Sequence, residues 1–202
     1  MRDLTGDAAT LLPGTAGAYL PAFSPDGRWI AYFADRALWK IAASGGSPQR
    51  LTDVEPSSRG LTWLGMDQIV FAPTSTSPLH VVSAAGGSSR AITSLDPGDG
   101  SRAYRSHRWP AAGPDGRSVV FTAQYPGETF GESSLAVVDV ASGRTTTLLD
   151  DAGTYPIVLP GDRLLYTSGA TVYAGRMDWS APASSARRVP SWMTSRISRS
   201  SG

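Results

Sequence analysis

The chain has 202 residues, of which 41% are hydrophobic and 17% are charged, a composition typical of a globular protein rather than of a disordered segment. Its formal net charge of +1 argues against a general nucleic-acid-binding protein, because such proteins carry a clear excess of basic residues. No apolar run approaches the roughly 20 residues that span a bilayer, and the absence of cysteine excludes disulfides and thiolate metal sites.

The stretch AFSPDGRWIAYFADRALWKIAASGGSPQRLTD, residues 22–53, has the pattern of four short antiparallel strands separated by turns. Its second strand, WIAYF, places Ile30 and Tyr32 on one face. The same pair of an aliphatic and then an aromatic residue returns in QIVFA, SVVFT and RLLYT, so the unit is repeated. The four units are expected at about 19–53, 60–94, 107–150 and 154–190. The aromatic residues of these pairs, which we expect to be buried, are Tyr32, Phe71, Phe121 and Tyr166.

The turn after the first strand of a unit has residue types with clear structural uses. SPDG at 24–27 and GPDG at 113–116 place proline where a turn begins, then aspartate, whose side chain can bond the local backbone. Glycine follows at the position where φ becomes positive. We therefore assign structural roles in turns to Asp26, Gly27, Asp115 and Gly116.

The second strands are apolar on both faces, which requires each sheet to be covered on both sides by its neighbours. Radial stacking of four-stranded antiparallel sheets is a β-propeller, in which repetition leaves few exposed edges. The sequence therefore predicts an all-β fold, a β-propeller of about four blades over residues 1–190. Residues 1–12 resemble the last strands of an earlier blade, so the expected form is a partial, open propeller, with a closed four-bladed ring as the alternative. The basic tail 191–202 shows no strand alternation and is expected to be disordered.

The repeat carries a family resemblance. FSPDGRWIAYF, followed by LWKI, GG and RLTD, resembles the WD40-like repeat called PD40, which occurs in the propellers of TolB-type proteins. More narrowly, residues 11–53 together with HRWPAAGPDGR at 107–117 resemble the propeller region of bacterial multidomain serine/threonine protein kinases. The resemblance covers residues 1 to about 190. It implies a fragment of a larger bacterial protein, located on the extracytoplasmic, periplasmic side of the membrane.

The sequence shows no catalytic motif. It has neither the glycine-rich, HRD and DFG motifs of a kinase nor the G-x-S-x-G nucleophile elbow of a hydrolase. We therefore expect no catalytic residues, no cofactor and no enzymatic activity, and a function as a noncatalytic protein-interaction or ligand-sensing module. The alternative is the accessory propeller of a peptidase or other hydrolase whose catalytic domain is absent from this chain.

No metal site is expected either. The two histidines fall in different units, and His80 occupies a column of packed residues. Asp96 and Asp99 in DPGDG lack the alternating oxygen ligands of a calcium loop.

A partner is expected on one face of the propeller. The loops that join fourth to first strands and second to third strands share this face, which carries the long loop 95–106 and the insertion AQYPGETFGES at 123–133. Arginine and aromatic residues on such loops are typical of recognition surfaces. The candidates for binding a protein or a small ligand are Arg105, His107, Arg108, Tyr125 and Phe130. Two alternatives stay open: that these loops only close the ring, and that His107 makes a structural hydrogen bond. Self-association through unpaired blade faces is a further expected contact.

Overall fold

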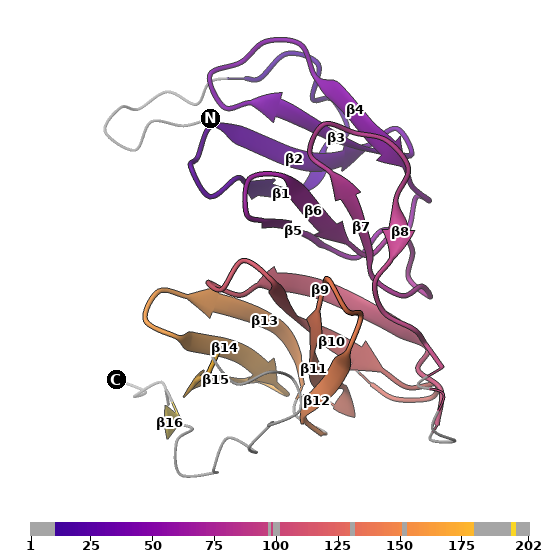
Figure 1. Cartoon of the computed structure of the whole chain (residues 1–202), viewed down its shortest axis with the longest axis vertical. Coiled ribbons are helices and arrows are strands. Elements are labelled where there is room, and N and C mark those ends of the chain that lie inside the picture. Colours follow the sequence, from indigo (N-terminus) through magenta and orange to yellow (C-terminus); the bar gives the residue numbers. More distant parts are fainter. Residues whose placement is uncertain are drawn as a thin grey trace.

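A computed structural model of the chain describes residues 11–96, 98, 102–129, 132–150, 153–179 and 195–196. Over these residues the chain forms four antiparallel sheets of four strands each, and within every sheet the strands follow one another in sequence order. The sheets are arranged as the blades of a four-bladed β-propeller, as predicted (Figure 1).

The strands of blade 1 are β1 (Tyr19–Phe23), β2 (Trp29–Ala34), β3 (Ala37–Ala42) and β4 (Gln49–Asp53). Those of blade 2 are β5 (Leu61–Leu64), β6 (Gln68–Phe71), β7 (His80–Ser83) and β8 (Arg90–Ala91). Blade 3 contains β9 (Ser106–Ala112), β10 (Ser118–Gln124), β11 (Ser134–Asp139) and β12 (Thr145–Leu149). Blade 4 contains β13 (Thr154–Leu159), β14 (Arg163–Ser168), β15 (Thr171–Arg176) and β16 (Ser195–Arg196).

The fourth strand of blade 4 lies later in the chain than the repeat spacing suggested. We expected it near residues 186–190, which lie outside the described residues. The strand that completes the sheet is β16, which pairs with β15 through Tyr173 opposite Arg196 and Ala174 opposite Ser195. It belongs to the tail in which no strand was expected. The expected remnant blade at residues 1–12 also falls almost wholly outside the described residues.

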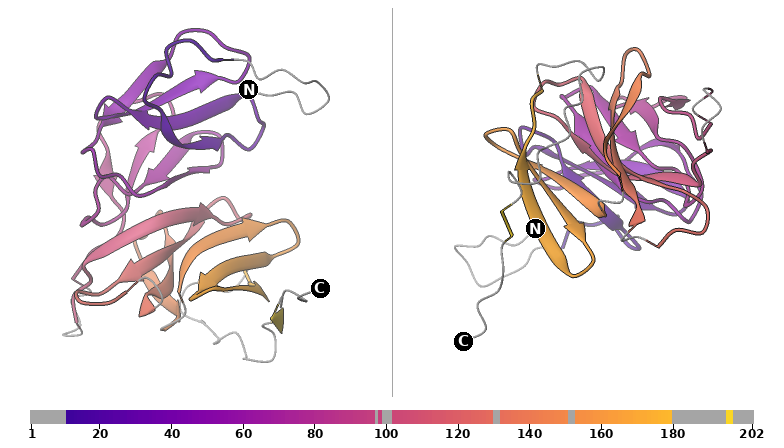
Figure 2. Two further views of the ribbon diagram at one scale, coloured as in Figure 1. Left: turned by 180° about the vertical axis from the view of Figure 1, so that it is seen from behind. Right: turned by 90° about the horizontal axis from the view of Figure 1, so that it is seen from below.

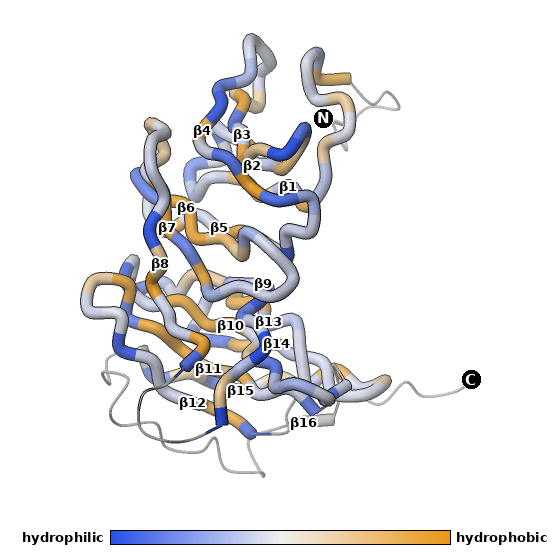
Figure 3. The backbone as a smooth tube through the Cα atoms, turned by 90° about the vertical axis from the view of Figure 1, so that its right-hand side faces the viewer, coloured by the Kyte–Doolittle hydropathy of each residue, from blue (hydrophilic) through white to orange (hydrophobic). Residues whose placement is uncertain are grey.

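The hydrophobic cores lie between successive blades, and hydrophobic residues are concentrated in the strands (Figure 3). In β6, Phe71 packs toward blade 1 whereas Val70 packs toward blade 3. In β10, Phe121 packs toward blade 2 and Val120 toward blade 4. Both faces of each inner sheet are therefore buried. The expected burial of the aromatic column is confirmed, with exposed fractions of 2%, 0%, 0% and 7% for Tyr32, Phe71, Phe121 and Tyr166.

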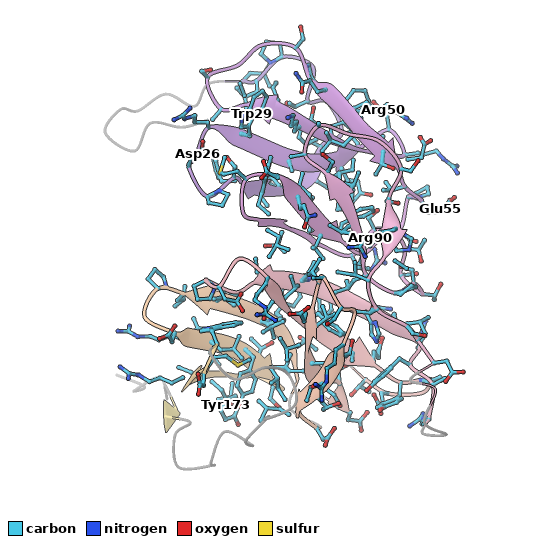
Figure 4. All side chains as sticks on the ribbon, viewed as in Figure 1. Asp26, Trp29, Arg50, Glu55, Arg90 and Tyr173 are labelled. Carbon is cyan, nitrogen blue, oxygen red and sulfur yellow. The ribbon has the colours of Figure 1, made fainter. Side chains whose placement is uncertain are left out.

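The four blades follow an arc (Figures 1 and 2). Blade 1 packs on blade 2 through β1 and β5, blade 2 on blade 3 through β5 and β9, and blade 3 on blade 4 through β9 and β13. Comparable packing between blades 1 and 4 is absent among the described strands. Side chains also link adjacent blades at their outer edge, where Arg90 Nη2 donates to the Val140 carbonyl oxygen at 3.3 Å (Figure 4).

The face of blade 1 that is turned away from blade 2 is covered by the segment before β1. Ile30 and Tyr32 belong to a cluster against which Leu12 packs. The Tyr32 hydroxyl donates to the Gly14 carbonyl oxygen at 3.4 Å. The first blade therefore does not present a bare apolar face.

The turn between β1 and β2 is stabilised by its own side chains. Asp26 Oδ1 accepts hydrogen bonds from Ser24 Oγ at 2.6 Å and from the Arg28 amide at 3.1 Å. Ser24 Oγ in turn accepts the Trp29 amide at 2.9 Å. The hydrogen bond from Ser24, followed by that from Arg28, lowers the pKa of Asp26. The φ of Gly27 is 71°, in the left-handed region that glycine enters without a steric penalty.

We expect Gly27→Val to lower the free energy of unfolding by roughly 1 kcal/mol or more, because a β-branched residue is strained at this φ. Gly27→Asn should cost less, since asparagine enters the left-handed region more readily. Urea denaturation of the three proteins measures both effects. An unchanged midpoint in the valine variant would contradict the role assigned to this turn.

Candidate functional site

The loop face carries a cavity of about 470 Å³ at the junction of blades 2 and 3. Its walls come from the β4–β5 and β8–β9 connections, the β6–β7 loop, the β10–β11 insertion and strands β9 and β10. We call it the arginine pocket. It is lined by Arg59, Ser75, Arg105, Arg108, Gln124, Glu128 and Thr129. The structure thus brings together two predicted binding residues, Arg105 and Arg108.

Arg108 is an unusually buried arginine, with an exposed fraction of 4%. Its Nε donates to Ser106 Oγ at 2.7 Å and its Nη2 to the Ser75 carbonyl oxygen at 2.7 Å. Burial lowers the pKa of the Arg108 guanidinium, and repulsion from Arg59 and Arg105 lowers it further. The two hydrogen bonds fix a positive charge in the wall of the pocket.

The other two arginines are more open to solvent. Arg59 is half-buried, and its Nη1 donates to the carbonyl oxygens of Ser57 and Ser58 at 3.0 and 3.1 Å. The Arg105 side chain is exposed, while its backbone amide donates to the Gln124 carbonyl oxygen at 2.6 Å. Within the described residues neither Arg59 nor Arg105 forms an ion pair.

The carboxylate that lines the pocket is already engaged elsewhere. Glu128 Oε1 lies 3.6 Å from Arg102 Nη1, and Glu128 Oε2 accepts the Tyr125 amide at 2.9 Å. Within the described residues the Glu128 carboxylate is thus paired with Arg102 rather than with Arg59 or Arg105.

Gln124 contributes a buried side-chain amide to the lining of the pocket. Its exposed fraction is 3%, and its Nε2 donates to the Glu128 carbonyl oxygen at 3.0 Å. Its Oε1 is buried and has no hydrogen-bond partner in the described part of the chain. A buried acceptor without a donor costs roughly 1–3 kcal/mol.

The described part of the β10–β11 insertion packs on the β8–β9 connection beside the pocket. Tyr125 stacks on Tyr104 with ring centroids 4.5 Å apart, and the Arg102 guanidinium lies 5.0 Å from the Tyr125 ring centre. Burial, followed by the hydrogen bond with Tyr104, raises the pKa of Tyr125 well above its usual range. Tyr125 thus lies next to the pocket without lining it. Phe130, the remaining aromatic candidate of this insertion, lies outside the described residues.

His107 is placed in the core rather than at the pocket. It is fully buried, its Nδ1 lies 2.8 Å from Thr93 Oγ1, and its ring packs 4.7 Å from that of Phe121. These contacts fit the structural alternative left open for this residue. Burial lowers the pKa of His107 to about 3.

We expect His107 to make stability depend on pH. An unfolded histidine has a pKa near 6.5, so between pH 6.5 and 3 the unfolded chain binds a proton that the folded chain excludes. The free energy of unfolding should therefore be fully retained above pH 6.5. It should fall as the pH is lowered from there, by at most about 1.4 kcal/mol per pH unit.

His107→Gln, which cannot titrate, should reduce this decline between pH 6.5 and 5, where most carboxyl groups remain charged. Urea denaturation of both proteins across this range measures the difference. His80, whose pKa burial also lowers, titrates in both proteins and so serves as an internal reference. Parallel profiles for the two proteins would contradict the assignment.

Sequence reasoning missed Arg59 and Gln124. Arg59 lies in the β4–β5 loop, which joins a fourth strand to a first strand. Loops of this class were already expected on this face, so the position of Arg59 in the sequence could have identified it as a candidate. Gln124 ends β10 and reads as an ordinary polar residue. The described residues contain no group of three or more histidine, cysteine, aspartate or glutamate side chains that could hold a metal ion. None of the described segments forms a helix with the length and hydropathy needed to span a bilayer.

Comparison with known proteins supports the fold. No protein-family model and no curated protein sequence matches the chain. TolB from Acinetobacter baumannii superposes with a TM-score of 0.62 at 15% identity, over 79% of this chain and 41% of that one. A putative TolB from Agrobacterium tumefaciens gives 0.60 at 20% identity, over 81% and 60%.

A puromycin-hydrolyzing peptidase from Mycobacterium tuberculosis gives a TM-score of 0.61 at 15% identity, over 86% of this chain and 30% of the peptidase. The chain therefore spans between about a third and three fifths of the length of these proteins. Identities this low establish a shared fold and no more. The PD40-like motifs and these similarities agree that the chain has a β-propeller fold of the kind found in TolB-type proteins.

Proposed function

We propose that this chain is a noncatalytic binding module that holds a protein partner or a small ligand on its loop face, at the arginine pocket. The observation that carries this proposal is the convergence of three arginines, Arg59, Arg105 and Arg108, from loops and strands at the junction of two blades. Concave sites with a few convergent polar groups are the usual form of ligand pockets, and loops on a rigid scaffold are their usual location. The arginine side chains that line the pocket offer positive charge and hydrogen-bond donors, which suit the binding of a ligand.

The test is an NMR titration of the full chain with a panel of cationic, neutral and anionic small molecules and short peptides. We expect amide shifts confined to the loop face, around Arg59, Arg105 and Gln124. The turns at Gly27 and Gly116, on the opposite face, should not respond. Ligands that perturb only those turns, or a panel in which nothing binds, would contradict the proposal.

We further propose that this propeller is part of a larger bacterial protein, such as a membrane-bound serine/threonine kinase or a TolB-type protein, on the extracytoplasmic side of the membrane. The support is the PD40-like repeat and the fact that the chain spans 41% and 60% of the two TolB chains. Sequencing of the flanking gene regions tests this. A kinase domain and a membrane segment upstream are the expected result for the kinase parent.

The second candidate function is that of an accessory propeller in a peptidase. It is favoured by the similarity to the puromycin-hydrolyzing peptidase and to a prolyl endopeptidase, the latter at a TM-score of 0.54 and 22% identity over 85% of this chain. A hydrolase domain encoded downstream of the propeller would decide for this alternative.

We also propose that the free end of the arc associates with a second copy of the chain. The face of β14 that carries Leu165 is turned away from blade 3, because Leu164 and Tyr166 point into the core with blade 3. On this outward face, Ile157 of β13 and Val172 of β15 are 50% and 42% exposed. Exposed apolar sheet faces of this kind favour association.

We therefore expect light scattering to give a mass above the 21.2 kDa of one chain, and Ile157→Lys to shift the population toward the monomer. Met66→Lys is the matched control, because Met66 is 41% exposed but lies in the β5–β6 turn of blade 2. A wild-type monomer at all concentrations would contradict the proposal, as would an equal effect of both lysine variants.

A further inference from the structure

Successive blades contact one another through the same two positions of their first strands. Between blades 1 and 2, Trp63 Nε1 of β5 donates to the Ala22 carbonyl oxygen of β1 at 3.1 Å. Between blades 2 and 3, the Ala112 amide of β9 donates to Thr62 Oγ1 of β5 at 3.2 Å. The pairing of first with second strands makes Trp63 equivalent to Ala112, which we call the backward-facing position. It likewise makes Ala22 equivalent to Thr62, the forward-facing position, so the interface has a direction.

A third position of the first strands also meets its counterpart in the next blade. It lies two residues before the forward-facing position and has a positive φ in all four blades, at Leu20, Gly60, Trp109 and Tyr155. A Cβ atom added at Gly60 would lie 3.0 Å from Trp109 Cα, and the Trp109 ring stacks on Tyr155 at 4.1 Å. This series of contacts stops at Tyr155, which is 47% exposed.

The two ends of the arc present the two halves of this interface without a partner (Figure 1). Phe23 occupies the backward-facing position of blade 1 and is 54% exposed, whereas its equivalent Trp63 is 4% exposed. Ile157 occupies the forward-facing position of blade 4 and is 50% exposed. The segment before β1 packs Leu12 against the cluster of Ile30 but leaves Phe23 open to solvent. Each end therefore lacks what the other end carries.

We propose that two copies of the chain associate head to tail, with the blade 1 face of one copy docked on the blade 4 face of the other, so that Phe23 lies against Ile157 of the second copy. This inference rests on the proposed association of the free end of the arc and names the surface that covers it. The contact continues the interface between successive blades and removes exposed apolar side chains from water. Because the two surfaces differ, the contact is heterologous, and each copy carries both of them.

The test mixes two variants of the full chain and measures mass by light scattering. Phe23→Lys disables the blade 1 face and Ile157→Lys disables the blade 4 face, while each variant keeps the other face intact. We expect each variant alone to have the 21.2 kDa mass of one chain. An equimolar mixture should reach twice that mass, because the intact blade 4 face of the first variant binds the intact blade 1 face of the second. The double variant is the control, since it should stay a monomer and bind neither single variant.

Cross-linking tests the same contact without adding charge. The chain has no cysteine, so a single introduced cysteine is the only thiol. With a short bismaleimide reagent, a mixture of Phe23→Cys and Ile157→Cys should give more cross-linked dimer than either variant alone. Met66→Cys in place of Ile157→Cys is the matched control, because Met66 is 41% exposed but lies in the β5–β6 turn of blade 2. That mixture should show no gain. Urea denaturation establishes that each variant is folded.

The outcomes separate this inference from the proposed association. If Ile157→Lys is monomeric while Phe23→Lys associates as the wild type does, two blade 4 faces meet each other, so the association stands and the head-to-tail inference is overturned. If the wild-type chain is a monomer at all concentrations, both are overturned, and the end faces are left for further blades of a parent protein. A mixture of the two lysine variants that stays monomeric, together with no gain in cross-linking, also overturns the inference.

Discussion

Phe121→Ala is expected to lower the free energy of unfolding by roughly 3–5 kcal/mol, the range typical of a buried phenylalanine cut to alanine. The Phe121 side chain is fully buried in the core between blades 2 and 3, where it packs with Leu79, Val81 and Ile92 of blade 2. It also contacts the buried ring of His107. The substitution removes apolar contacts on both sides of the interface and leaves a cavity that rigid strands cannot close.

The matched control is Phe23→Ala, because Phe23 is an aromatic residue of β1 that is 54% exposed. We expect it to cost about 1 kcal/mol or less, since surface substitutions have small effects. Urea denaturation followed by circular dichroism gives both values. If the two substitutions cost the same, Phe121 does not occupy the core between the blades, and the strand register proposed from the sequence fails with it.

The strands that the sequence predicted best are the second strands of the blades. Their signal is local, since an aliphatic residue followed two positions later by an aromatic one fixes the face within a single strand. The four copies reinforced one another, and the strands of blade 1 run from Tyr19 to Asp53. Repetition also identified the propeller, because sheets that are apolar on both faces have few other ways to be covered.

The first strands contain a feature that the sequence did not reveal. Leu20, Trp109 and Tyr155 each precede a proline and have φ values of 50°, 49° and 59°. Each lies where the pairing between first and second strand is irregular. A residue before proline normally favours an extended conformation, so a positive φ at these three positions is not expected from the sequence. Only the packing of the assembled blades maintains such strained residues, as in the stacking of Trp109 on Tyr155 at 4.1 Å.

The sequence predicted only part of the candidate site, because the rest depends on how the assembled blades pack. The loop face and two of its arginines followed from strand order, which determines the side on which a loop emerges. The convergence of Arg59 with Arg105 and Arg108 depends on how blade 2 packs against blade 3, and no local pattern encodes that contact. The burial of His107 likewise results from this interface, since its neighbours Thr93 and Phe121 come from different blades.

The close approach of β13 to β14 leads to the second large effect. Gly153 directly precedes β13 and has a φ of 102°. A Cβ atom added there would lie 1.8 Å from the Thr167 carbonyl oxygen and 2.7 Å from its carbonyl carbon. Thr167 is held in β14 by its pairing with Thr154 and Val172, so its backbone cannot move without breaking the sheet.

Gly153→Ala is therefore expected to cost roughly 2–6 kcal/mol, because backbone strain and overpacking each contribute roughly 1–3 kcal/mol. Gly161→Ala separates the two causes. Gly161 lies in the same blade with a φ of 77°, but a Cβ added there meets no atom within 4 Å. Only the conformational cost of roughly 1 kcal/mol applies to it. Urea denaturation gives both free energies, and amide exchange along β13 should accelerate only in the Gly153 variant. Equal costs for the two substitutions would mean that β13 does not approach Thr167 as described, and that blade 4 begins with a looser pairing than its backbone geometry indicates.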